Sequence, residues 1–450
     1  MKCCSKRGEK LMSTEKQKVF WRGWAMVGLA FILSIVPQGF GIYHFSMIRG
    51  SLVDALGATS AEVGFAYSWF ALSLAIMGLF IGSILNKVGV RWSVRISAVI
   101  YSIGFIVVAF ATNLPMVFVG YILLGAGNAF AGVLIVTGIP SNWIVKRRGI
   151  ANGVIWGATF FASLICSNFV AFFVTNYNYQ TALVGLAILS FIIIMAVSFF
   201  IVWRPQDEGL LPDGLTPEQA SERLEEAGSA KIVGLTRGQA MKTRTFWVMF
   251  VAIFLIGVGE MGPFQNLVMF TRSMDFDIAL GAAIMSTIGF VSLFAKLGCG
   301  WLIDKIGARG AYLTCEVLAG AGLVLMMFIT PESSITFVWA SVILFGFGES
   351  AAIVCFTAAC GQFMGVKNYA QIFGVIFLAK ALGDAVGSPL IAAIAEGSMG
   401  WAGAFGIAAA CCIVSAIIFF LAHKEKGLIA LEEQAAKEMQ EALNAKGVDA

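Results

Sequence analysis

The stretch GWLIDKIGAR, Gly300 to Arg309, joins two long apolar segments, and GSILNKVGVR, Gly82 to Arg91, repeats its pattern 218 residues earlier. Each copy has a glycine, a polar residue followed by lysine, a second glycine and an arginine at the same spacing. A short polar turn between two oily runs is typical of the connection between membrane helices. The stretch therefore predicts a membrane protein with an internal repeat.

Two further matches extend the repeat. LGAGN, Leu124 to Asn128, corresponds to FGFGE, Phe345 to Glu349, and ANGVI, 151–155, corresponds to IFGVI, 372–376, both with an offset of 221 residues. Matching halves in a membrane protein indicate a pseudo-twofold axis along the membrane normal, with a cavity between the halves.

Composition indicates the same class. Of 450 residues, 59% are hydrophobic and only 12% are charged, whereas soluble domains carry about a quarter charged residues. Apolar segments that cross the bilayer must be helices, because lipid offers their backbone no hydrogen bonds. The fold class is therefore all-α membrane protein, and we expect twelve spans at 24–48, 61–85, 93–112, 115–139, 149–175, 181–203, 246–270, 279–303, 311–330, 335–362, 369–395 and 400–422.

The basic residues predict the orientation. Of the 30 Lys and Arg residues, 26 fall in the tails and loops of one side, while Arg49 and Arg272 are expected in loops of the other. The positive-inside rule then places both termini in the cytoplasm of a multi-pass plasma-membrane protein. The basic start reads as a retained tail, with Met1 or Met12 as the first residue. The predicted order of tail, six-helix bundle, linker, six-helix bundle and tail is 1–23, 24–203, 204–245, 246–422 and 423–450.

Several classes of function are disfavoured. Seven of the nine cysteines lie inside apolar segments, where cysteine behaves as a small hydrophobe, so neither disulfides nor a zinc site is indicated. Two histidines are too few for a histidine-rich metal centre. The sequence lacks Walker, nucleophile-elbow and HExxH motifs and has no basic patch for nucleic acid. We expect no enzyme, no cofactor and no metal.

The paired loop resembles the signature of the major facilitator superfamily, and the resemblance covers nearly the whole chain. It implies twelve helices in two pseudo-symmetric six-helix bundles. It also implies a conformational latch, in which glycines pack closely and charges tie helix ends together. Asn86 replaces the acid that the family has at this position, which weakens the first latch. The latch residues are Gly82, Asn86, Lys87, Gly89 and Arg91 in the first copy and Gly300, Asp304, Lys305, Gly307 and Arg309 in the second.

A finer resemblance points to the oxalate:formate antiporter family and the related monocarboxylate transporters. It rests on NWIVKRRGIANGVIWGATF, PQDEGLLPDG and GFVSLFAKLGCG. Both groups carry a cation in helix 8, which here is Lys296, and the antiporters also have a helix 11 lysine, which Lys380 matches. One departure is Ser292, where the monocarboxylate transporters have an acid.

The two lysines within spans are the strongest functional candidates. A charge at mid-bilayer costs at least about 2.5–3.5 kcal/mol, so it is functional by default. Lys296 and Lys380 are expected near mid-depth, where together they would bind a carboxylate. The alternative is a structural network, in which Lys380 pairs with Asp384 four residues later and Lys296 pairs with Glu260 or Glu349.

Acids and aromatic residues complete the expected site. Burial favours the neutral form of a carboxyl group, which suits Glu260, Glu349 and Asp384 to proton coupling or gating, although each could instead be a fixed counter-ion. Aromatic rings at cavity depth could cage a small planar carboxylate; the candidates are Tyr43, Trp156 and Phe377.

These features together predict a secondary transporter. We expect alternating-access transport of a mono- or dicarboxylate by a monomer in the lipid bilayer, either in exchange for another anion or with protons. Two alternatives remain open: a proton-coupled carrier for an amphipathic or cationic compound, and a membrane sensor that transports nothing.

Overall fold

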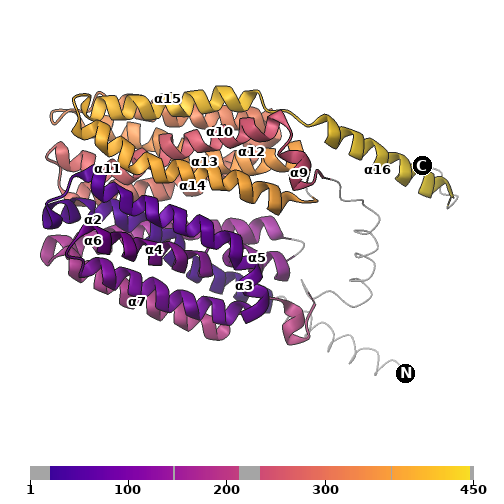
Figure 1. The fold of residues 1–450 in the computed structure, drawn as a ribbon, viewed down its shortest axis with the longest axis horizontal. Helices are drawn as coiled ribbons and strands as arrows, with labels where there is room; N and C mark the ends of the chain where they lie inside the picture. The colour runs from indigo at the N-terminus through magenta and orange to yellow at the C-terminus, as the bar shows by residue number, and fades with distance from the viewer. Residues whose placement is uncertain (1–20, 145–146, 212–233, 366, 446–450) are drawn as a thin grey trace, which may run out of the picture. The chain divides into compact units, whose positions relative to one another are not determined.

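The computed structural model describes residues 21–144, 147–211, 234–365 and 367–445, and these are almost entirely helical (Figure 1). Most of the predicted N-terminal tail, with Met1 and Met12, lies outside the described residues, as does the middle of the predicted linker.

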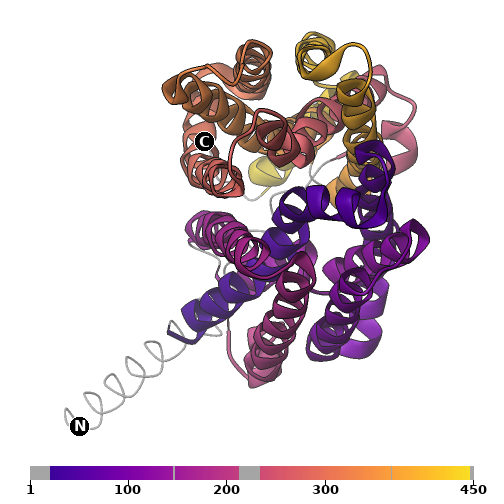
Figure 2. The ribbon, with the colours of Figure 1, turned by 90° about the vertical axis from the view of Figure 1, so that its left-hand side faces the viewer.

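The chain forms two compact units. The first unit combines residues 1–223 with 276–289, and the second combines 224–275 with 290–450. Within each unit the long helices run alongside one another, and Figure 2 shows them nearly end-on.

The helices of the first unit follow the predicted spans. In chain order they are Trp21–Ile35, η1 (Val36–Phe40), α2 (Gly41–Leu56), α3 (Ser60–Ala109), α4 (Leu114–Ala131), α5 (Val133–Trp143), α6 (Arg148–Asn176), α7 (Tyr179–Phe200) and η2 (Pro205–Glu208).

The second unit repeats this arrangement. Its elements are α9 (Arg237–Ala240), α10 (Arg244–Ile256), η4 (Gly257–Met261), α11 (Gly262–Ser273), α12 (Ile278–Met326), whose start belongs to the first unit, α13 (Ile335–Met364), α14 (Tyr369–Glu396), α15 (Gly400–Phe420) and α16 (Lys426–Ala445).

The helix count agrees with twelve spans. Nine helices in the described part of the chain are long and apolar enough to cross a membrane. Two of them, α3 and α12, have 50 and 49 residues, and each bends at a glycine, so each covers two predicted spans. The helical run from Trp21 to Leu56 supplies the remaining one.

The bends fall at Gly89 and Gly307, the second glycines of the two signature loops. Their φ angles are 78° and 74°, in the left-handed region where a Cβ atom is strained. The expectation of close glycine packing is wrong here, because a Cβ at either position, or at Gly82 or Gly300, would meet no atom within 4 Å. The second glycine of each loop is therefore needed for its left-handed backbone conformation and not for close packing.

A wide π-turn interrupts the first long helical run of each unit, between Trp21–Ile35 and α2 in the first and between α10 and α11 in the second. These turns, η1 (Val36–Phe40) and η4 (Gly257–Met261), lie 221 residues apart, the offset of the internal repeat. A proline lies in or just after each turn, Pro37 and Pro263, and lacks the N–H that an α-helix would use. Such turns often occur at functional sites.

Arg49 is not in a loop, contrary to the prediction from its sequence position. The helix α2 continues to Leu56, and Arg49 is fully buried within it. Its guanidinium donates a hydrogen bond to the carbonyl of Ser60 and lies over the Phe45 ring, 5.4 Å from the ring centre. Arg49 therefore packs inside the first unit, whereas the prediction had placed it in a loop.

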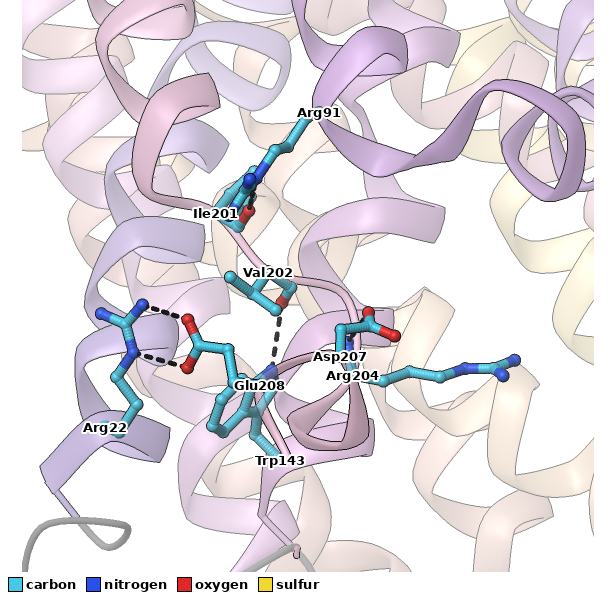
Figure 3. Close-up of polar contacts among 8 residues, drawn as sticks. All are labelled: Arg22, Arg91, Trp143, Ile201, Val202, Arg204, Asp207 and Glu208. Atoms are coloured by element: carbon cyan, nitrogen blue, oxygen red, sulfur yellow. Dashed lines mark hydrogen bonds and ion pairs between the residues drawn. The ribbon is translucent and has the colours of Figure 1, made fainter. Parts of the chain in front are cut away.

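The chain after α7 is tied to the ends of neighbouring helices (Figure 3). The carbonyls of residues 201–203 accept hydrogen bonds from the side chains of Arg91, Trp143 and Asn142, each at 3.0 Å. Because Arg91 belongs to the first signature loop, this loop does hold a helix end, through a backbone carbonyl.

An ion pair closes the same region. Arg22 donates two hydrogen bonds to the carboxylate of Glu208, at 3.0 and 2.5 Å (Figure 3). The hydrogen bond from Arg22 holds the pKa of Glu208 below its usual value, against a smaller opposing effect of burial. The first helix is thereby connected to η2.

Candidate functional site

Six Lys, Asp and Glu side chains lie well inside the apolar spans of the second unit, among the residues that the structure describes. Two are lysines and four are acids, so the group carries a net charge of −2 if all are ionised. The six residues, called here the charge cluster, are Lys296 and Glu316 of α12, Glu260 of η4, Glu349 of α13, and Lys380 and Asp384 of α14.

Lys380 and Asp384 form an ion pair on adjacent turns of α14. The ammonium group donates to both carboxylate oxygens, at 2.8 and 3.0 Å. The two side chains are 13% and 14% exposed. The alternative interpretation of Lys380 as a partner of Asp384 therefore describes the conformation seen here.

Glu260, which lies in the π-turn η4, joins this pair. It is 3% exposed and interacts electrostatically with Lys380 and Asp384. The helices approach closely at glycines: a Cβ on Gly257 would lie 2.7 Å from the backbone of both Lys380 and Asp384, and a Cβ on Gly383 would clash with the Phe254 carbonyl. Small residues are what allow membrane helices to approach this closely.

Lys296 and Glu349 form a second part of the cluster. They interact electrostatically, as the alternative interpretation allows, and Glu349 also accepts a hydrogen bond from the Ser350 hydroxyl at 2.9 Å. Glu349 further interacts with Lys380 and Asp384, so this pair and the α14 pair share one network.

Glu316 is the member that sequence reasoning missed. It is fully buried beside Tyr312 and Cys412, and it interacts electrostatically with Glu260 and Lys380. Neither of its carboxylate oxygens accepts a geometrically good hydrogen bond from any residue the structure describes. The sequence alone could have identified it, because Glu316 is the one charged residue in the apolar run 311–330.

Charge balance limits what this cluster can do. Unpaired charges in a low-dielectric interior are costly, so a cluster with two more acids than lysines is neutral only with two protons on its carboxyl groups. Proton uptake restores this balance, and an anion can then bind without a net charge only if a further proton enters with it.

The repeat does not require these charges. At the offsets of 218 and 221 residues, the six members of the cluster correspond to uncharged residues of the first half. These are Gly39, Gly78, Ala98, Asn128, Thr159 and Ser163. Asn128 has a structural contact, because its amide donates to the Pro37 carbonyl of η1 at 2.7 Å. The cluster is thus a property of the second unit alone.

The predicted aromatic residues are divided between the units. Phe377 lies one turn before Lys380 on α14, is 40% exposed and packs against Phe373, with ring centres 5.7 Å apart. Tyr43 is buried in α2 and Trp156 is half-buried in α6, both in the first unit. Their contact with a substrate stays a prediction.

Comparison with known proteins agrees with this description. The family model described as Major Facilitator Superfamily matches residues 29–388 and 293–445. The oxalate:formate antiporter of Oxalobacter formigenes is 27% identical, over 89% of this chain and 90% of the relative. Monocarboxylate transporter 13 of Bos taurus is 23% identical over 89% of each chain. An uncharacterized transporter, YhjX of Escherichia coli, is 24% identical over 76% of this chain and 81% of the relative.

Solved structures show the same fold. The xylose transporter XylE from E. coli, in a partially occluded inward-open conformation, superposes with a TM-score of 0.68 at 13% identity. The match covers 88% of this chain and 98% of that one. A peptide transporter, POT, has a TM-score of 0.67 and covers the same share of this chain. The expected twelve-helix fold is confirmed.

Proposed function

Because this chain belongs to the Major Facilitator Superfamily, we propose that it transports a small mono- or dicarboxylate by alternating access and couples this transport to protons. The observation that carries the proposal is the cluster of two lysines and four acids, buried or partly buried within the spans. Two relatives, named as an oxalate:formate antiporter and a monocarboxylate transporter, support the substrate class.

The ion pair on α14 suggests how coupling works. While Asp384 is ionised, it occupies the ammonium group of Lys380. A proton that neutralises Asp384 frees Lys380 to bind a carboxylate, and release of the substrate returns Lys380 to Asp384 and expels the proton. One proton then accompanies each carboxylate charge, so the interior never holds an unbalanced charge.

The other charged residues have supporting roles. Lys296 binds a second carboxylate or the far oxygen of the first, with Glu349 as its partner when no substrate is present. Glu260 and Glu349 pass the proton or gate its access, and Phe377 packs against the substrate one turn from Lys380. The two signature loops act as conformational latches.

Location is part of the proposal. We infer a monomer in the cytoplasmic membrane with both termini in the cytoplasm, which the placement of 26 of the 30 basic residues supports.

Uptake into proteoliposomes tests the function. Labelled oxalate, formate and lactate are offered with an inward proton gradient, or with unlabelled anion inside for exchange. Losing a charged hydrogen bond costs about 1.5–3 kcal/mol, so Lys296→Ala and Lys380→Ala should each weaken carboxylate affinity about 10- to 100-fold. Lys242→Ala, which changes an exposed lysine outside the spans, is the matched control.

Other outcomes point elsewhere. Carboxylate uptake that survives both lysine substitutions contradicts the proposal. Uptake of organic cations that depends on Glu260 and Glu349 favours the cationic carrier, and a protein that moves no solute under any gradient favours the sensor. If anions exchange but the proton gradient has no effect on the rate, proton coupling is contradicted and carboxylate transport is not.

A further inference from the structure

Three cysteine thiols meet inside the second unit. The Cys299 sulfur lies 2.9 Å from the Cys355 sulfur, and the Cys315 sulfur lies 3.9 Å from the Cys355 sulfur. All three sulfurs lie within 4.8 Å of one another, and all three residues are buried. The group, called here the thiol cluster, has no role in the proposed transport function.

The bend at Gly307 creates the thiol cluster. Cys299 lies eight residues before this glycine and Cys315 eight residues after it, so folding α12 back on itself brings the two sulfurs together. The helix α13 supplies Cys355. Cys299 is one turn from Lys296, and Cys315 precedes Glu316, so the thiol cluster borders the charge cluster.

Burial limits the kinds of ligand that fit. Soft sulfur ligands select soft, thiophilic partners. A divalent ion such as zinc prefers four ligands, and with three thiolates it would leave a net negative charge in a dry interior, which is costly. A trivalent partner that forms three sulfur bonds leaves no charge.

We propose that Cys299, Cys315 and Cys355 form a binding site for trivalent arsenic, taken up as neutral arsenous acid. Each thiol loses its proton, each arsenic–oxygen bond is replaced by an arsenic–sulfur bond, and three waters leave. No atom changes oxidation state, and both reactants and product are uncharged. A small neutral reactant enters the interior without the desolvation cost that an ion would bear.

The sulfur positions need little adjustment. Trivalent arsenic keeps a lone pair, so its three sulfur bonds form a pyramid with angles somewhat below tetrahedral. For bonds of roughly 2.3 Å, the length of zinc–sulfur bonds, the three sulfurs then lie about 3.4–3.5 Å apart. The Cys315–Cys355 separation of 3.9 Å and the Cys299–Cys355 separation of 2.9 Å each differ from this by about 0.5 Å, which small side-chain rotations provide.

The test measures binding directly and does not depend on transport. The purified full chain, with Cys3 and Cys4 changed to serine so that this neighbouring pair cannot bind, is incubated with arsenite and desalted. We expect about one arsenic per chain, three sulfur neighbours by X-ray absorption spectroscopy, and release by a competing small dithiol.

Substitutions identify the ligands. Cys299→Ser, Cys315→Ser and Cys355→Ser should each lower retained arsenic at least tenfold. Two cysteines outside the thiol cluster serve as controls, so Cys166→Ser and Cys360→Ser should retain as much as the parent. If a serine variant fails to fold, Cys299→Ala, Cys315→Ala or Cys355→Ala replaces it, because alanine removes the sulfur and keeps this buried position apolar; these variants should lose retained arsenic to the same extent.

Three results would overturn the site: no retained arsenic, equal retention after all three substitutions, or an arsenic with fewer than three sulfur neighbours. None of these would affect the transport proposal, whose readout is solute uptake.

Discussion

Lys380 and Asp384 form an ion pair on consecutive turns of α14, in which the ammonium group contacts both carboxylate oxygens, at 2.8 and 3.0 Å. The α-helix brings side chains four residues apart onto one face, so the pair is a local feature of the sequence. Its position beside Glu260, at the glycine-mediated crossing of two helices, is a feature of the fold.

The first prediction concerns coupling. Asp384→Asn should keep carboxylate exchange but remove its dependence on a proton gradient, because Lys380 then has no Asp384 carboxylate to which it can return. The measurement compares uptake with and without an inward proton gradient, in the parent and in Asp384→Asn. Asp54→Asn, which changes an exposed acid in α2, is the control. A variant that still responds fully to the gradient would place the coupling proton on another acid.

The same pair predicts non-additive stability. Removing one partner of a buried ion pair leaves an uncompensated charge and costs about 3–5 kcal/mol in dry sites, and less here, where the side chains are 13% and 14% exposed. Lys380→Ala should therefore lower the unfolding temperature more than Lys380→Ala with Asp384→Ala. Thermal unfolding in detergent gives the comparison, and equal losses in the single and double variants would argue against a paired state.

The crossing of α10 and α14 predicts a contrast between two glycines of one helix. A Cβ on Gly383 would meet the Phe254 carbonyl, whereas a Cβ on Gly374 would meet nothing within 4 Å. Gly383→Ala should destabilise the protein by about 1–3 kcal/mol through overpacking, while Gly374→Ala should be neutral or slightly stabilising. Thermal unfolding of the two variants checks this, and an equal response would mean that the crossing relaxes freely.

The bend of α12 predicts a second contrast. Gly307, the second glycine of the signature loop, has a φ of 74°. Gly300, the first glycine of the same loop, lies in regular helix. Alanine in the left-handed region costs about 1–2 kcal/mol, so Gly307→Ala should lower stability while Gly300→Ala should not. If both behave alike, a strained φ is not what the second glycine provides.

The Arg22–Glu208 pair predicts a pH dependence. The pKa of Glu208 is lowered in the folded protein by the hydrogen bond from Arg22, so the pair stabilises the fold above the usual carboxyl pKa of 4.5 and ceases to do so as the pH falls through the lowered value. The parent should exceed Glu208→Gln in stability at pH 7 by at most about 1 kcal/mol, because both side chains are partly exposed. The difference should shrink as the pH falls below 4.5 and vanish once Glu208 is protonated in the folded protein. A difference that does not fall with pH would contradict the assignment.

Much of the fold was predictable, because lipid allows few ways to satisfy a backbone. The apolar runs fixed helices such as α6 and α15 to within two residues at each end, and the paired loops indicated the repeat. The spacing of Lys380 and Asp384 likewise allowed their ion pair to be anticipated.

Other features depend on three-dimensional contacts. Arg49 looked like a loop residue because arginine is polar, yet α2 continues around it. Cys299 and Cys315 are far apart in an extended chain and meet only because Gly307 reverses the path. The π-turns could not be predicted from hydrophobic periodicity, which keeps the same period on both sides of a single wide turn. The sequence marks them by Pro37 and Pro263.

The matched π-turns η1 and η4 separate backbone shape from chemistry. The same wide turn occurs at corresponding places of the two halves, with Gly39 in one and Glu260 in the other. The turn therefore does not depend on its carboxylate, and one backbone device serves two halves of which only the second places a charge there.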